Sequence, residues 1–170
     1  NRDATLNAAI KSKRGVSLGG EFRYLEPHYK GQILADWMPN DALRDRQRWS
    51  LSGQHQGQLD SPIGGLGLNL NLQRVSDDDY WRDFPRATQP LRQRLLPGDA
   101  QLNWAQNDQS ARLRVLKWQT LQDLASPILP PYDRMPQLTG RWARVNDRGF
   151  DYSVEADYTR FRGDRNLLLQ

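Results

Sequence analysis

The chain has 170 residues, a mass of 19.7 kDa and a formal net charge of +4. This length suits one domain, and because the chain begins at Asn1 rather than at methionine, we expect a processed or excised segment. No apolar run is longer than three residues, which excludes a transmembrane helix and a signal peptide, and the absence of cysteine excludes a disulfide framework and thiolate metal sites.

The first half of the chain alternates apolar and polar residues, and this period of two predicts β-strands. Residues 4–10 and 16–24 form a predicted hairpin around a turn signal at 12–15. Further strands are predicted at 29–37, 49–56 and 66–72, with a charged loop at 39–47 and a break at 60–62.

The second half continues the pattern less regularly. Strands are predicted at 99–106, 111–118, 138–142 and 150–159, with a proline-rich loop at 125–132. Leu116 and Trp118 fall in the opposite phase to the apolar residues before them, which predicts a bulge. About nine strands with short links and no helical period predict an all-β fold, an antiparallel up-and-down meander.

The two faces of the predicted strands differ in chemistry. One face carries Asn, Gln, Ser, Thr, Arg and Asp with very little Lys, and the other carries Leu, Ala, Gly and Val with aromatic residues near strand ends. This combination is typical of a transmembrane β-barrel with a water-filled lumen. The alternative is a soluble antiparallel β module that binds a ligand or a polyanion, in which Trp and Tyr belong to the core.

Several short sequence motifs occur in a recognisable order along the chain. They lie at 20–25, 38–41, 48–49 and 134–138, and the most distinctive consists of Val75, Ser76, Asp77, Asp78, Asp79, Tyr80, Trp81, Arg82, Asp83 and Phe84. Over about residues 1–162 the chain resembles the family of lipopolysaccharide-assembly proteins LptD, also called OstA.

The resemblance implies a fragment of a large transmembrane β-barrel. Members of the family are Gram-negative outer-membrane barrels of twenty-six strands, with a periplasmic jelly-roll domain before the barrel. Residues 1–170 would form a partial barrel domain similar to the second to tenth strands, and the jelly-roll domain, the remaining strands and the family's disulfide cysteines would lie outside them. Ala8 stands where the family often has a proline in its second strand.

The resemblance also implies a function and partners. The family receives lipopolysaccharide from a periplasmic bridge of Lpt proteins and delivers it to the outer leaflet, while the lipoprotein LptE plugs the lumen. The implied partners are therefore lipopolysaccharide, an LptE-type plug, the Lpt bridge acting through the jelly-roll domain, and outer-membrane lipid.

Strand alternation divides the candidate site residues into sets. Because amides, hydroxyls and charges can bond to a saccharide head or to a plug protein, we expect lumen-facing positions at Glu21, Arg23, Gln54, Gln56, Asn69, Asn71, Asp151, Glu155 and Asp157. Lipid-facing positions are predicted at Phe22, Ile33, Leu66, Leu68, Leu70, Leu72 and Val154. Interfacial aromatic residues are predicted at Tyr24, Trp37, Trp49, Trp142 and Tyr158.

The acidic run at 77–79, together with Asp83, fits two interpretations. Clustered carboxylates could hold a calcium ion, or they could form an acidic turn between strands. We favour the turn, with its charges meeting Arg74, Arg82 and Arg86.

The remaining motifs give little support for catalysis or for nucleic-acid binding. His28 and His55 share no metal or triad spacing. Arg112 and Arg114, near Trp118, fit luminal or interfacial strand positions better than base stacking. No phosphate loop, nucleophile elbow or paired-histidine motif occurs, so we expect no enzyme, no cofactor and no metal.

Overall fold

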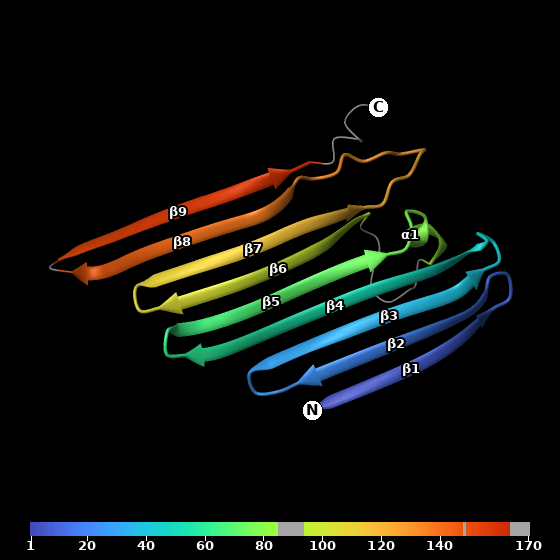
Figure 1. The fold of residues 1–170 in the computed structure, drawn as a ribbon, viewed down its shortest axis with the longest axis horizontal. Coiled ribbons are helices and arrows are strands. Elements are labelled where there is room, and N and C mark those ends of the chain that lie inside the picture. Colours follow the sequence, from blue (N-terminus) through green and yellow to red (C-terminus); the bar gives the residue numbers. More distant parts are fainter. Residues whose placement is uncertain (85–93, 148, 164–170) are drawn as a thin grey trace.

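The computed structural model describes residues 1–84, 94–147 and 149–163 and shows one sheet of nine antiparallel strands in chain order (Figure 1). The strands are β1 (Arg2–Lys11), β2 (Gly15–Leu25), β3 (Tyr29–Asp41), β4 (Arg46–Ser61), β5 (Gly64–Val75), β6 (Leu95–Gln106), β7 (Gln109–Thr120), β8 (Asp133–Asp147) and β9 (Phe150–Arg162). One helical turn, α1 (Tyr80–Asp83), follows β5. The predicted antiparallel meander is confirmed.

The connections at the two ends of the sheet differ in length. At one end, the turns at 26–28, 62–63 and 107–108 are tight, and Gly64 at φ +113° and Asn107 at φ +49° adopt the left-handed backbone that tight turns need. At the other end, the turns at 12–14 and 42–45 are also short, but the connections at 76–94 and 121–132 are long. We call these the short-turn end and the long-connection end.

The pairing register decides which residues share a face of the sheet. Between β5 and β6, Leu68 pairs with Leu102 and Asn69 pairs with Gln101. Side chains alternate along a strand, so the leucines lie on one face and the amides on the other. We call them the apolar face and the polar face, and the ladders from β1 to β9 extend both across the sheet.

Three details differ from the sequence prediction. The charged loop predicted at 39–47 is shorter, because β3 continues to Asp41 and β4 already begins at Arg46. The turn α1 was not expected, since four residues are too few to show a helical period. The bulge predicted within 111–118 is wrong: β7 pairs with β6 without any register shift, and Leu116 and Trp118 simply lie on the polar face. The register shift opposite Arg114 and Leu116 belongs to β8, where the extra residue falls between Arg134 and Gln137.

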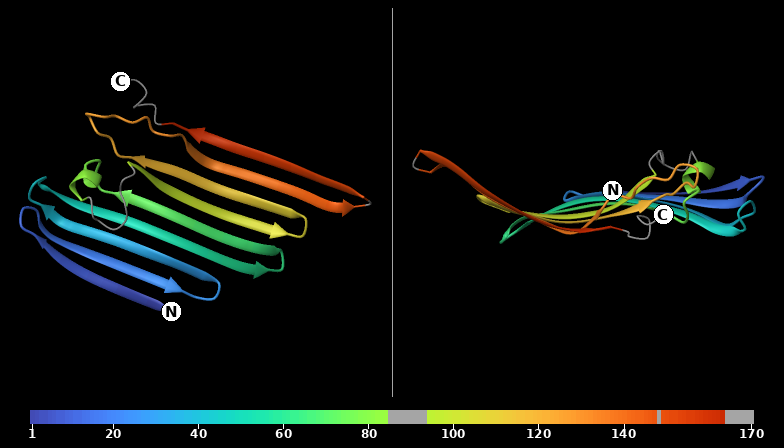
Figure 2. Two further views of the ribbon diagram at one scale, coloured as in Figure 1. Left: turned by 180° about the vertical axis from the view of Figure 1, so that it is seen from behind. Right: turned by 90° about the horizontal axis from the view of Figure 1, so that it is seen from above.

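Buried side chains gather at the long-connection end. There α1 stands off one side of the curved sheet (Figure 2). Its aromatic residues pack in a cluster drawn from several strands and from the second long connection: Met38, Val75, Tyr80, Phe84, Leu96 and Leu121. Met38 lies on the polar face, because it pairs with Arg48 one residue away from the Trp37–Trp49 pair. The cluster therefore covers part of the polar face.

The sheet does not close on itself. The strands β1 and β9 form its two edges, and each pairs on one side only. Among the described residues, no helix is long and apolar enough to cross a membrane.

Candidate functional site

The polar face is a wall of amide side chains. Gln54 pairs with Asn71, and Gln56 pairs with Asn69, which pairs in turn with Gln101 on β6. By register this one face carries Glu21, Arg23, Gln54, Gln56, Asn69, Asn71, Glu155 and Asp157, and alternation along β9 adds Asp151. The Oδ1 atom of Asn71 is buried and has no hydrogen-bond partner within the described part of the chain.

Several charges on the polar face are paired with charges of opposite sign. Arg23 lies 2.6 Å from Asp3, and Arg114 lies 2.6 Å from Asp99 on the neighbouring strand. Farther along the sheet, the Thr139 hydroxyl donates a hydrogen bond of 2.8 Å to Asp157. Pairing of this kind leaves a wall rich in hydrogen-bonding groups without a strong field of one sign.

The opposite face is apolar and largely exposed. The register places on it the residues predicted to face lipid, Phe22, Ile33, Leu66, Leu68, Leu70, Leu72 and Val154, and the aromatic residues Tyr24, Trp37, Trp49, Trp142 and Tyr158. Leu70 is 38% exposed and Val154 is 59% exposed. An apolar surface of this extent is typical of contact with lipid or with another protein.

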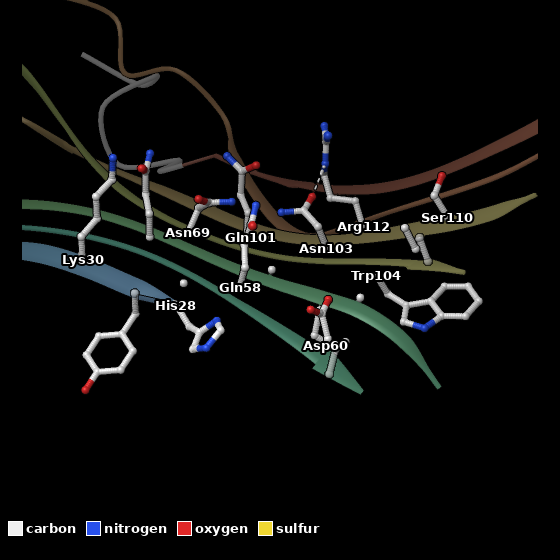
Figure 3. Close-up of a pocket in the computed structure, with 18 of the residues that line it drawn as sticks. His28, Lys30, Gln58, Asp60, Asn69, Gln101, Asn103, Trp104, Ser110 and Arg112 are labelled. Atoms are coloured by element: carbon white, nitrogen blue, oxygen red, sulfur yellow. Dashed lines mark hydrogen bonds between the residues drawn. The ribbon is translucent and has the colours of Figure 1, made fainter. Parts of the chain in front are cut away.

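A hollow of about 1150 Å³ lies on the polar face toward the short-turn end. Figure 3 shows Lys30, Asn69, Gln101, Asn103 and Arg112, from four different strands, pointing to the same side. The Arg112 Nε group donates a hydrogen bond of 2.8 Å to Asn103. Amides and cations together can bind hydroxyl and phosphate groups.

At the long-connection end, a buried arginine fastens the residues 77–84, which we call the cap, to the polar face. The side chain of Arg48 on β4 is fully buried. Its guanidinium lies 2.6 to 3.1 Å from three carboxylates, those of Asp41, Asp77 and Asp83. It also lies over the Phe84 ring, 4.8 Å from the centroid.

Two further arginines tie the cap to neighbouring turns. Arg14, in the turn after β1, lies 3.1 Å from Asp83, and Arg44, in the turn after β3, lies 3.0 Å from it. Burial alone would raise the pKa of the Asp83 carboxyl, but hydrogen bonds from Arg44, Arg48 and Arg14 hold this pKa well below its usual range. The cap thus joins three separate parts of the sheet.

Sequence reasoning found the acidic run but not most of its partners. Arg82 does lie 3.9 Å from Asp79, as predicted. The principal partners of the run are instead Arg44, Arg46 and Arg48. Arg74 has no ion pair with the run among the described residues, because it belongs to the apolar face, and Arg86 lies outside those residues. In the sequence Arg48 looks like an ordinary base beside a charged loop, and its burial depends on the folded cap.

The histidines and arginines considered in the sequence analysis lie in a turn and on strands of the sheet. His28 lies in the turn between β2 and β3. His55 lies on the apolar face of β4, where its Nδ1 is 2.7 Å from the Tyr24 hydroxyl. Arg112 and Arg114 lie on the polar face with the bonds described above. Within the described ranges, no group of three or more His, Cys, Asp or Glu residues is placed to hold a metal ion.

A continuous antiparallel meander with one exposed apolar face, one polar face of amides and paired charges, and tight turns at one end is a segment of a transmembrane β-barrel wall. The family model described as LptD, LPS transport system D, matches residues 46–167. The chain belongs to this LptD family.

Relatives support the assignment along the whole chain. It is similar to proteins named LPS-assembly protein LptD from Polaromonas sp. (58% identical over all of this chain), from Acidovorax sp. (55% over 97%) and from Ralstonia nicotianae (37% over 95%). The chain spans 22%, 21% and 20% of the lengths of these three relatives.

Proposed function

We propose that this chain forms part of the wall of an outer-membrane barrel that assembles lipopolysaccharide into the outer leaflet of a Gram-negative bacterium. It would supply strands equivalent to the second to tenth of the family's barrel. The observation that carries the proposal is the separation of chemistry between the two faces: amides and paired charges on one face, and exposed apolar residues on the other.

The polar face suits a path for a saccharide. Lipopolysaccharide has a phosphorylated, sugar-rich head that must cross without contacting hydrocarbon. Gln56, Asn69 and Gln101 form a row of amides that can exchange hydrogen bonds with sugar hydroxyls. Because Arg23 and Arg114 are paired with aspartates, the wall would hold a phosphorylated cargo less tightly than a dense surface of unpaired cations would.

Strand order supports an orientation in the membrane. If β1 corresponds to the second strand of a barrel that follows a periplasmic domain, the first strand runs outward and β1 runs back toward the periplasm. Since β1 begins at the short-turn end, where Arg2 pairs with Tyr24 beside the turn at 26–28, the short-turn end would face outward. The long-connection end with the cap would then face the periplasm, the side from which an LptE-type plug and the Lpt bridge would approach.

The role proposed is transport and assembly rather than catalysis. A soluble β module is a poorer fit, because its large apolar residues would be packed in a core. Here Leu68, Leu102 and Leu138 are 39%, 44% and 49% exposed.

A photo-crosslinking experiment in cells tests the proposal. A photoreactive amino acid would be placed at Asn69 or Gln101 in the full-length protein, with Leu68 and Leu102, their strand neighbours on the other face, as matched controls. We expect polar-face positions to crosslink the saccharide part of newly made lipopolysaccharide and apolar-face positions to crosslink acyl chains. Mild acid hydrolysis of the adducts separates these two parts.

Two results would contradict the proposal. Saccharide adducts at Leu68 and Leu102 but not at Asn69 and Gln101 would reverse the assignment of the faces. Soluble-protein adducts at all four positions, with no lipid or saccharide adduct, would support a soluble module instead.

A further inference from the structure

Basic residues occupy the long-connection end of the apolar face in the C-terminal half of the sheet. The strands β5, β7 and β9 run toward the long-connection end, and each carries a row of apolar residues followed by a base. Leu72 precedes Arg74 on β5, Val115 precedes Lys117 on β7, and on β9 the bases are Arg160 and Arg162. We call Arg74, Lys117, Arg160 and Arg162 the rim bases.

The register places the rim bases on the apolar face. Lys117 pairs with Gly98, which pairs with Leu72 of the apolar row. Arg74 follows Leu72 by two residues, and Arg160 follows Tyr158, whose partner Leu138 belongs to the same face. The rim bases therefore point away from the polar face and from the cap.

The rim bases lack ion pairs of the kind that Arg23, Arg48 and Arg114 make. Within the described residues, no carboxylate lies within 4.0 Å of a rim base. Asp133, the carboxylate paired in register with Arg162, instead accepts a hydrogen bond of 2.8 Å from the Trp118 backbone N–H. Lys117, Arg160 and Arg162 are exposed, and Arg74 is half-buried.

The short-turn end of the same face gives an internal comparison. Among the described residues this rim carries two bases, and both are paired: Arg2 lies 3.3 Å from Glu26 and Arg144 lies 3.2 Å from Asp108. In the part of the chain that the structure describes, the two rims of the apolar surface therefore differ: the bases of the short-turn rim have carboxylate partners, and the rim bases have none. A long basic side chain at such a rim can lay its carbons on the apolar surface and extend its charge to the membrane interface.

We propose that the rim bases bind the phosphate groups of lipid headgroups in the leaflet that surrounds the long-connection end. The inference rests on the proposed function, because it requires the apolar face to lie in a bilayer. Guanidinium groups bind phosphate oxygens in a bidentate manner, and an ammonium group binds them as a point charge. This lipid is the boundary lipid outside the wall, not cargo on the polar face.

Electron paramagnetic resonance of labelled lipids tests the site. The full-length protein would be reconstituted in phosphatidylcholine bilayers with a trace of spin-labelled phosphatidic acid or spin-labelled phosphatidylcholine. We expect the immobilised fraction to be larger for phosphatidic acid, and this preference to be lost in the variant Arg74→Gln/Lys117→Gln/Arg160→Gln/Arg162→Gln. The matched control removes bases from the polar face: Lys30→Gln/Arg112→Gln/Arg141→Gln should keep the preference.

The outcomes separate the site from the function on which it rests. An immobilised component for both lipids without any preference would overturn the rim site alone. Absence of an immobilised component for either lipid would overturn the membrane placement as well. Equal loss of preference in the control variant, or abolition of the preference by inorganic phosphate in the wild type, would show a diffuse charge effect or a free-phosphate site rather than headgroup binding.

Discussion

Arg48 is the residue on which the cap depends most. It is buried with three carboxylates around it, so its removal leaves negative charges without a partner in a place that water reaches poorly. Burying a charge costs free energy in itself. The contribution of this ionic cluster to stability is therefore seen most clearly when one of its charged side chains is removed. Two predictions follow from this cluster, one for a substitution and one for acid.

The variant Arg48→Met should release the cap. Removing one partner of a buried ionic group costs about 3–5 kcal/mol, so the backbone amides at 80–84, including the Phe84 N–H bonded to the Tyr80 carbonyl, should exchange faster in hydrogen–deuterium exchange of the full-length protein. The control Arg114→Met breaks a pair whose arginine is 27% exposed, and it should leave the cap unchanged. Equal protection in Arg48→Met and wild type would contradict this role, and Asp83→Asn offers a milder test of the same contact.

The cap should be resistant to mild acid. Because the pKa of Asp83 is lowered by its arginine partners, its ion pairing stabilises the cap fully above the ordinary aspartate pKa of about 3.9 and is lost only as the pH falls from there toward the lowered value. A spin label on Asp78→Cys, at an exposed position of the cap, should show constant mobility from neutral pH to about pH 4. A sharp rise in mobility near pH 6 would contradict this account.

At the scale of single strands, the close approach of neighbouring strands depends on glycine at particular positions. A Cβ at Gly31 would collide with the Tyr24 ring on the next strand and would lie 2.6 Å from the Gln54 carbonyl oxygen, whereas a Cβ at Gly53 would meet nothing within 4 Å. Gly31→Ala should therefore destabilise the barrel by about 1–3 kcal/mol, and Gly53→Ala should be tolerated. Denaturant unfolding of the two variants from vesicles makes the comparison, and equal midpoints would show that the Tyr24 contact is easily displaced.

The second prediction for a single strand concerns which face of β5 meets the bilayer. Leu70→Arg places a charge on the apolar face and should cost about 2–4 kcal/mol if that face meets the bilayer near its midplane. Asn71→Arg, one residue away on the polar face, should cost much less. Reversible unfolding from phosphatidylcholine vesicles gives both values, and a larger penalty for Asn71→Arg would mean that the faces are assigned the wrong way round.

For the whole molecule, alternation was sufficient to predict the meander but not the cap. Alternating leucines predict both the strand β5 and the face of the sheet on which they lie: Leu66, Leu68, Leu70 and Leu72. A one-residue slip in register would exchange the two faces. The ends of β3 and β4 could not be predicted in this way. Asp41 and Arg48 look like loop and strand-end charges in the sequence, and they become buried only because residues from 77–84 fold back over them.

The same limit applies to the candidate site. The polar and apolar sets could be sorted from the sequence, because each depends on neighbours two residues apart. Pairings such as Arg48 with Asp83 depend on contacts between residues 35 positions apart, and no local pattern carries them. Membership of the LptD family agrees with the alternation and adds a function that alternation alone does not give.

The measurement that tests the central claim most directly is a spin-label scan along β5 of the full-length protein in bilayers. Single cysteines from 66 to 73 would be labelled, and the accessibility of each label to oxygen and to a water-soluble nickel chelate would be compared. We predict that labels at even positions respond to oxygen and labels at odd positions respond to the chelate, with a period of two. Uniform access of the chelate at all positions, or the opposite phase, would contradict the placement of this segment in a barrel wall.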